Sequence, residues 1–333
     1  MRQVGLVAIQ QRLEPEEYAD LSRLERRLAA LVEEGLGQLP GDLPTLVAFP
    51  EDTGTLLAFA EDGDLLTAHG ELAAAVRALA LRHLWGALRL RLTRRVSTIR
   101  ALFLERAARA HQAYVELFGG LARRYGCYLV AGSGVFPDHR LEDGQARLLP
   151  GPHVYNTSYL FDPDGRVVAS QKKVHLVELE GEGYLDLTPA PLEALTVVPT
   201  PVGRVGVAIC FDAFHEDVLQ RLQAQGVQIL VQPSANPRVW DEWQRDDWVR
   251  GAWAAVLAHP GCPLYAVNPM LVGSLFDLGF EGQSGIFTGH PALGREAGYA
   301  GRPARPGVLA LARSWQEGEV LAVAVPHPDE VPL

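Results

Sequence analysis

The amino-acid sequence predicts an α/β fold in which two β-sheets pack against each other, rather than one parallel sheet. Strand-like apolar runs alternate along the chain with segments of helical spacing. Hairpin signals stand among them, and the turn DPDG at 162–165 between two strand-like runs is the clearest. No segment resembles a linker, so we expect a single domain over residues 1–333.

Composition and charge narrow the class of protein. The chain has 333 residues, of which 48% are hydrophobic and 21% charged, and this supports a large buried core. Its formal net charge of −10 argues against a nucleic-acid partner or an acidic membrane surface, and only a local basic patch could reverse that. Cys127, Cys210 and Cys262 show no CxxC or metal-ligand spacing, which favours a reducing compartment. With no signal peptide and no bilayer-length apolar run, we expect a cytoplasmic protein.

The N-terminal part has the pattern of a β-α-β unit. The ranges 4–10 and 45–49 are apolar and strand-like, and 14–35 has the spacing of an amphipathic helix. The second strand is followed directly by Glu51. Side chains at the carboxyl ends of strands line the site in open α/β folds, so Glu51 is a candidate, with a solvated loop carboxylate as the alternative.

Residues 53–110 are predicted to form a helical insertion within this domain, and helical character continues to about residue 124. The part at 84–110 is basic, in contrast to the acidic chain as a whole. We expect it to pack over the core or to form a subunit contact, with Glu105, Glu116 and the acidic remainder pairing its arginines. A membrane-surface helix is the alternative.

The central part supplies two further strands and a lysine. The range 128–134 is a strand that ends in a glycine-rich turn, but it lacks the Lys-Ser/Thr of a phosphate-binding loop. The hairpin of 156–161 and 166–170 leads to Lys173 and then to an acidic loop. Further strands are expected at 227–232, 263–268 and 281–287. A tryptophan-rich helix lies between the first two, and core packing is the default for its tryptophans.

The stretch 202–216, VGRVGVAICFDAFHE, places Cys210 between a buried strand and a following helix. A cysteine there lies near unpaired backbone N–H groups and the positive end of a helix dipole, a setting that favours a thiolate. The alternative is a small buried hydrophobic residue, as most free cysteines are.

Glu51, Lys173 and Cys210 have complementary chemistry. A thiol needs a base to become a good nucleophile, and a carboxylate excluded from water can have its pKa raised enough to serve. The tetrahedral intermediate of acyl transfer carries an oxyanion, which needs a cation or N–H donors in place. Lys173 and the backbone N–H of Phe211 could provide them.

Three ordered motifs resemble the nitrilase superfamily of carbon–nitrogen hydrolases: FPE at 49–51, KVHL at 173–176 and GVAICFD at 206–212. The hairpin at 155–176, VNP at 267–269 and FEGQSGIF at 280–287 also resemble the family. The resemblance covers nearly the whole chain except the insertion. It implies a four-layer αββα sandwich that assembles as a homodimer or higher homo-oligomer, without a metal or organic cofactor.

The resemblance also implies a mechanism. Glu51 takes the proton of Cys210, the thiolate attacks an amide or nitrile carbon, and Lys173 stabilises the oxyanion. Many members use a second glutamate between the lysine and the cysteine. Glu182 is the choice here because its distance to Pro189 best resembles the family, with Glu180 as the alternative.

We therefore expect hydrolysis of a non-peptide C–N bond in a small amide or N-carbamoyl compound, through a thioester and with release of ammonia or an amine. Phe211-Asp212 resembles the amide-cleaving branches more than the nitrilases, which tend to carry Trp-Glu there. Asn236 and Arg238 are candidates for substrate binding, since Arg238 could pair a substrate carboxylate.

Three alternatives stay open: a catalytically silent binding or scaffold protein, an acyltransferase or nitrilase with the same residues, and a Cys–His dyad using His175 or His215.

Overall fold

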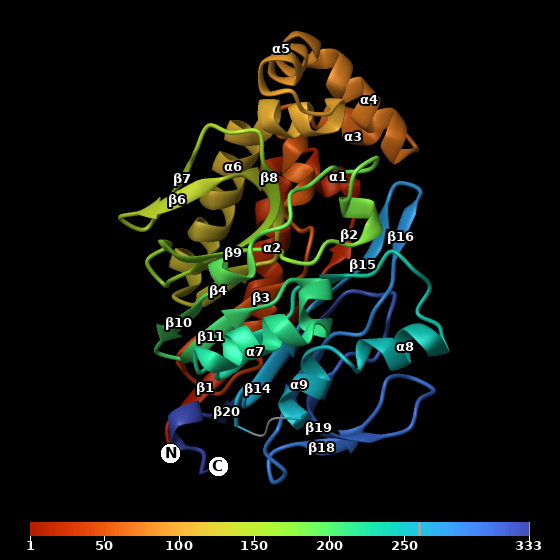
Figure 1. The fold of residues 1–333 in the computed structure, drawn as a ribbon. Helices are drawn as coiled ribbons and strands as arrows, with labels where there is room; N and C mark the ends of the chain where they lie inside the picture. Colours follow the sequence, from red (N-terminus) through yellow and green to blue (C-terminus); the bar gives the residue numbers. More distant parts are fainter. Residues whose placement is uncertain (259–260, 333) are drawn as a thin grey trace.

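The computed structural model describes residues 1–258 and 261–332, and it shows two seven-stranded sheets packed face to face (Figure 1). Helices cover the outer faces of both sheets, so the predicted four-layer αββα sandwich is confirmed. The first sheet has the order β20 (Glu319–Pro326), β1 (Gln3–Gln10), β3 (Thr45–Phe49), β4 (Tyr128–Ala131), β8 (Val154–Phe161) and β5 (Gly134–Pro137), with β9 (Val167–Lys172) also paired to β8.

The second sheet has the order β10 (Val197–Thr200), β11 (Gly203–Val207), β12 (Ile229–Val231), β14 (Tyr265–Asn268), β17 (Gly285–Thr288), β19 (Arg305–Leu311) and β18 (Arg295–Ala297). A smaller sheet contains β13 (Ser234–Ala235), β15 (Met270–Leu275), β16 (Leu278–Phe280) and β2 (Arg12–Leu13), and β6 (His139–Glu142) pairs with β7 (Gln145–Leu148).

The helices are α1 (Pro15–Tyr18), α2 (Leu21–Gly37), α3 (Asp64–Ala68), α4 (Leu72–Arg82), α5 (Leu84–Arg94), α6 (Thr98–Tyr125), α7 (Glu216–Ala224), α8 (Glu242–Trp248) and α9 (Ala252–Ala258). Short 3-10 turns are η1 (Thr55–Phe59), η2 (Glu178–Glu180), η3 (Leu192–Ala194), η4 (Cys210–Phe214) and η5 (Pro328–Glu330).

The first sheet is apolar on both faces because both are covered. In β1, Leu6 and Ala8 belong to the core shared with the second sheet, whereas Val7 and Ile9 pack under α2 and α6. This alternation follows from the period of two in a strand. Strands buried on both sides read as continuous apolar runs, which is why these segments are recognisable in the sequence.

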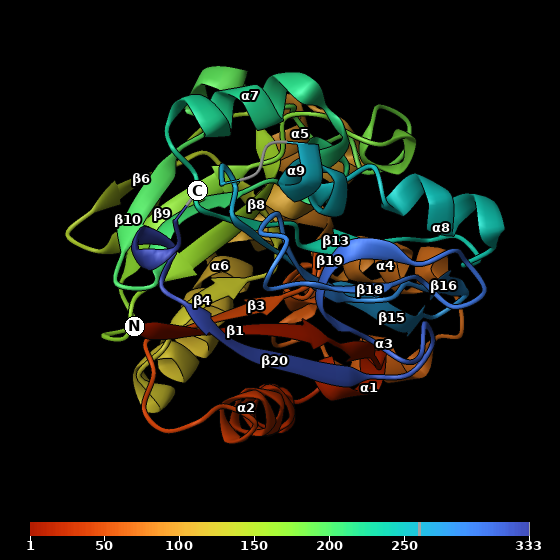
Figure 2. The ribbon, with the colours of Figure 1, turned by 90° about the horizontal axis from the view of Figure 1, so that it is seen from below.

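The C-terminal strand β20 completes the first sheet. It pairs antiparallel with the whole of β1, from Gln3 opposite Pro326 to Gln10 opposite Glu319, and Figure 2 shows the two strands side by side. A segment more than 300 residues from β1 in the chain thus forms the edge of this sheet.

Two predicted helices are each divided in the structure. The segment 14–35 forms α1 and α2, because the side chain of Asp20 accepts hydrogen bonds from Ser22 N and Arg23 N and starts a new helix. The tryptophan-rich segment forms α8 and α9. Trp240 and Trp253 are buried, as core packing predicts, but Trp243 on α8 is exposed.

The helices α3 to α5 lie at the end of the molecule opposite the two termini (Figure 1). The expected insertion, residues 53–110, ends inside α6, which continues without interruption to Tyr125. The expected pairing of its arginines with Glu105 and Glu116 is wrong: Glu105 contacts His83, and Glu116 accepts a hydrogen bond from Gln112. The expected pairing with the acidic remainder is confirmed for three arginines, as Arg100 pairs with Asp186, Arg106 with Asp62 and Arg109 with Glu61. In the described ranges, no helix has the length and apolar character to cross a bilayer.

Candidate active site

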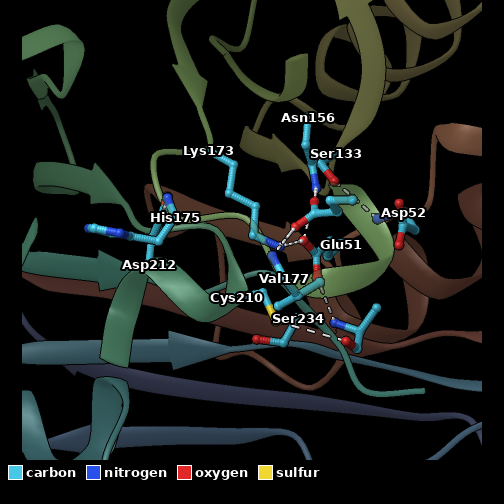
Figure 3. A network of polar contacts seen from close by, with 12 residues as sticks. Glu51, Asp52, Ser133, Asn156, Lys173, His175, Val177, Cys210, Asp212 and Ser234 are labelled. Carbon is cyan, nitrogen blue, oxygen red and sulfur yellow. Dashed lines mark hydrogen bonds and ion pairs between the residues drawn. The ribbon is translucent and has the colours of Figure 1, made fainter. Parts of the chain in front are cut away.

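The three candidate residues at strand ends come together between the two sheets. Glu51 directly follows Pro50 at the end of β3, Lys173 follows β9, and Cys210 begins η4 after β11. Figure 3 shows their side chains pointing toward one another. Glu51, Lys173 and Cys210 are all buried, so their charges interact with little screening by water.

The Lys173 ammonium group is held between two carboxylates. Its Nζ lies 2.7 Å from Glu51 Oε1 and 2.7 Å from Glu180 Oε2, and the side chain is 1% exposed. Burial alone would lower the pKa of Lys173, but Glu51 and Glu180 raise it well above its ordinary value. An ammonium group has three N–H donors, so one remains for a third acceptor.

Glu51 is fixed at both carboxylate oxygens. Oε1 accepts hydrogen bonds from Lys173 Nζ at 2.7 Å and from Asn156 Nδ2 at 2.9 Å, and Oε2 accepts one from Ala235 N at 3.1 Å. Burial raises the pKa of Glu51 to about 7, although Lys173 opposes the shift. A carboxyl group with such a pKa can both take up and release a proton near neutral pH.

Cys210 adopts a left-handed backbone conformation with φ of 48°, which is uncommon for a residue other than glycine. Its N–H donates to Pro233 O at 2.8 Å, and its Sγ lies 3.8 Å from Ala235 O. The turn thereby fixes the thiol close to Glu51.

The expectation of a resting thiolate is wrong. Burial, followed by the charge of Glu51, raises the pKa of Cys210 well above its ordinary value, and Lys173 offsets only part of this. The helical turn η4 has only five residues, so its dipole contributes little against burial. The resting thiol is therefore protonated and needs a base to become a nucleophile.

Phe211, the next residue, has a side chain that is partly exposed. Within residues 1–258 and 261–332, its backbone N–H has no hydrogen-bond partner. This N–H is therefore open to a bound group, and its role as an oxyanion donor stays a prediction.

The second glutamate beside Lys173 is Glu180, and Glu182 is exposed to solvent. Glu180 Oε1 accepts from Asn156 Nδ2 at 2.7 Å, and its Oε2 accepts from Val177 N at 3.0 Å. The 3-10 turn η2 ends at Glu180 and directs this side chain inward. The choice of Glu182 is therefore wrong, and the alternative, Glu180, is the glutamate beside Lys173. Sequence spacing to Pro189 does not determine which side chain of the loop faces Lys173.

Asn156, on β8, was not among the expected site residues. Its Nδ2 donates to both Glu51 and Glu180, and its backbone O accepts from Lys173 N at 2.9 Å. The only signal in the sequence is an amide side chain within a buried strand, and that signal is weak because Thr157 and Ser158 beside it are polar too.

Asp212 joins the cysteine turn to the lysine segment. It is fully buried and accepts hydrogen bonds from Val174 N at 3.1 Å and His175 N at 2.7 Å. Burial raises its pKa to about 6, while these backbone donors oppose the shift. Asp212 therefore sets the position of the chain directly after Lys173 relative to Cys210.

His175 and His215 stack on each other, with ring centroids 3.7 Å apart and planes 10° from parallel. His175 Nε2 lies 3.1 Å from Asp217, and neither imidazole hydrogen-bonds to Cys210 in the described part of the chain. The geometry therefore does not support a Cys–His dyad. These two histidines and Asp217 also have ligand-type atoms within 4.8 Å of one another, but one cation cannot lie in the planes of two stacked rings.

The two expected substrate-binding residues lie after β13. Asn236 is buried, and its Nδ2 donates to Arg238 O and Glu281 O, both at 3.0 Å, so this amide fixes its own loop. Ala235, the last residue of β13 and the residue before Asn236, donates its N–H to Glu51. Arg238 is exposed, and its guanidinium forms no ion pair within the described ranges.

Comparison with known proteins places this site in context. The chain is 31% identical to an omega-amidase NIT2 of Danio rerio over 152 residues, which is 43% of this chain and 50% of that protein. The chain thus spans about half the length of the curated relatives it matches.

Solved structures share the fold over nearly the whole chain. Saccharomyces cerevisiae Nit3, a member of branch 10 of the nitrilase superfamily, has a TM-score of 0.55 at 18% identity, covering 97% of this chain and 90% of that one. An amidase from Nesterenkonia sp. has a TM-score of 0.55 at 17% identity, covering 99% and 93%.

The sequence model of the carbon–nitrogen hydrolase family matches residues 96–288, which is more than half of the chain and includes Lys173 and Cys210. The chain belongs to the carbon–nitrogen hydrolase family.

Proposed function

We propose that this protein hydrolyses a non-peptide C–N bond in a small amide or N-carbamoyl compound, through a thioester on Cys210. The observation that carries the proposal is the buried Lys173 ammonium group, held between Glu51 and Glu180 beside a thiol. The relatives named as amidases support the same reaction class.

Acylation begins when Glu51 accepts the Sγ proton of Cys210 and the sulfur attacks the carbonyl carbon. The pKa of Glu51, raised to about 7, lets it take this proton near neutrality. The carbonyl oxygen becomes an oxyanion. The third N–H of Lys173 and the free N–H of Phe211 are the donors that would stabilise it.

The tetrahedral intermediate then collapses. The C–N bond breaks, the proton held by Glu51 passes to the nitrogen, and ammonia or an amine leaves. Water next attacks the thioester as Glu51 accepts a proton from it. The C–S bond breaks, the proton returns to the sulfur, and the carboxylic or carbamic acid is released.

Glu180 and Asn156 are proposed as positioning residues. Glu180 keeps Lys173 protonated when Glu51 is neutral, because it remains a carboxylate partner within 2.7 Å of Nζ. Asn156 donates to both glutamates and so fixes the distance between them. Without Glu180, Lys173 would be a buried cation whose remaining carboxylate partner, Glu51, changes charge during the reaction.

Arg238 is proposed to bind a carboxylate on the substrate. It is exposed and close in sequence to Ala235, which hydrogen-bonds to Glu51. Arg238→Gln is then expected to raise KM for amides that carry a carboxylate and to leave neutral amides of equal size unaffected. Equal changes for both substrates would contradict this assignment.

The test of the reaction is an ammonia-release screen over amides, nitriles and carbamoyl amino acids. Cys210→Ala and Glu51→Gln are expected to abolish release while the melting temperature stays close to that of the wild type. Cys262→Ala is the matched control, because this partly buried thiol contacts Val227 O, just before the start of β12, rather than Glu51. Wild-type activity in either site variant would disprove the proposal.

Product analysis with and without an acceptor amine separates hydrolysis from acyl transfer by the same residues. The expected cytoplasmic location, homo-oligomeric state and independence of metal or organic cofactors remain predictions.

A further inference from the structure

The tip of the molecule formed by α4 and α5 exposes large apolar side chains. Trp85 is 81% exposed, Leu81 is 70% exposed and Leu92 is 69% exposed. On α5, the exposed Trp85 and Leu92 and the half-buried Leu88 have the spacing i, i+7 and i+3, which places them on one face of the helix. Exposed apolar clusters of this kind mark interaction surfaces rather than ordinary solvent-facing helices.

The segment that forms α4 and α5 is rich in arginines, and most of them lack an acidic partner. Seven arginines and no acidic residue lie between Glu71 and Glu105. Five of them are exposed and form no salt bridge to a described residue: Arg77, Arg89, Arg91, Arg94 and Arg95. The tip is thus a strongly basic patch on a chain whose net charge is −10.

A second copy of this chain fits the tip poorly. In a twofold contact the same patch meets itself, so unpaired arginines would face arginines with no acidic residue between them. The helix α5 has 11 residues and is about 16 Å long. Two such helices in contact fall short of the roughly 800 Å² per partner that a stable interface buries.

We propose that the α4–α5 tip binds the surface of an anionic membrane, with Trp85, Leu88 and Leu92 entering the interfacial region and the arginines contacting lipid headgroups. Tryptophan and leucine on one face with arginines beside them is the composition of interfacial helices. Arginines also attract anionic lipids within a Debye length of about 10 Å. The tip projects at the end of the molecule, so a flat surface can reach it without contacting the acidic remainder (Figure 1).

Flotation of the full-length protein with vesicles tests this directly. Vesicles of phosphatidylcholine with about a third phosphatidylglycerol are compared with pure phosphatidylcholine at low and high salt. The protein is expected to float with the anionic vesicles at low salt, with at least a tenfold smaller bound fraction on neutral vesicles or at high salt. No binding to anionic vesicles, or equal binding to neutral ones, would overturn the proposal.

Two variants and a matched control locate the contact. Trp85→Ser with Leu92→Ser, and separately Arg89→Gln with Arg94→Gln, are expected to lower partitioning about tenfold or more without a change in melting temperature. Trp243→Ser is the control, because Trp243 is 61% exposed on α8 beside acidic residues and is expected to leave binding unchanged.

Sedimentation of the same variants without lipid tests the competing interpretation, in which a second copy of this chain binds the tip. An unchanged oligomeric state on Trp85→Ser supports the membrane assignment. Dissociation of an oligomer by that substitution would identify the face as a contact between copies and would overturn it.

Discussion

Glu180→Gln is expected to impair turnover, whereas Glu182→Gln is not. Glu180 forms an ion pair with Lys173 Nζ at 2.7 Å and accepts a hydrogen bond from Val177 N at 3.0 Å, both in a buried setting. Glutamine keeps the size of the side chain and an acceptor oxygen, but it removes the negative charge. Glu182 is exposed, so it provides a substitution of the same chemistry only two residues away.

The expected magnitude follows from the lost charge. A hydrogen bond to a charged group contributes about 1.5–3 kcal/mol, and about 1.4 kcal/mol changes a rate tenfold. We therefore expect kcat/KM for ammonia release to fall about 10- to 100-fold in Glu180→Gln. Most of the loss should appear in kcat, because Glu180 acts through Lys173 on the oxyanion rather than on substrate binding.

Steady-state kinetics on one amide substrate, together with melting temperatures of both variants, check this expectation. A folded Glu180→Gln protein with wild-type kcat would refute the role of Glu180. A defect in Glu182→Gln of the same size would show that charge in the loop, rather than contact with Lys173, controls the rate.

The remaining predictions concern pH, positioning and the core. Because burial raises the pKa of Glu51 to about 7 and the base must be deprotonated, kcat/KM should increase with pH up to about 7 and then level off; a profile already flat from pH 5 would contradict this. Asp212→Asn should lower kcat about tenfold, since it weakens the acceptor for Val174 N and His175 N; an unchanged kcat in a folded variant would rule out a positioning role. Trp253→Ala should lower the free energy of unfolding by about 3–5 kcal/mol in urea unfolding, because this side chain is 1% exposed and stacks on Phe287. Trp243 is exposed, so Trp243→Ala should change the same free energy by less than about 0.5 kcal/mol.

Strand ends were the part of the site that the sequence could predict. Glu51 and Cys210 each follow an apolar run, Lys173 follows the second strand of a predicted hairpin, and the carboxyl ends of these strands meet at the site. The residues that depend on a loop path could not be predicted in this way. Glu180 and Glu182 lie in the same acidic loop, and only the turn η2 determines which of them faces inward.

The expectation that the position of Cys210 favours a thiolate was wrong for a related reason. A strand-to-helix junction is visible in the sequence, but the degree of burial around the thiol is not. Burial and the neighbouring Glu51 outweigh the short turn η4, and both depend on packing between two sheets.

Contacts between residues far apart in the chain could not be predicted from the sequence either. β20 completes the first sheet against β1, and Asn156 meets Glu51 across 105 residues of sequence. The insertion shows the opposite case: its helical and basic character is evident in the sequence, but its unpaired arginines appear only in the structure.

The thioester on Cys210 is the central claim, and mass spectrometry of the protein quenched in acid during turnover of a small amide tests it most directly. The account predicts that the mass of the acyl group is added to the peptide containing Cys210, with Cys127 and Cys262 unmodified, and that Cys210→Ala acquires no added mass. Formation of the acid product with no acyl group on Cys210 at any time during turnover would contradict it.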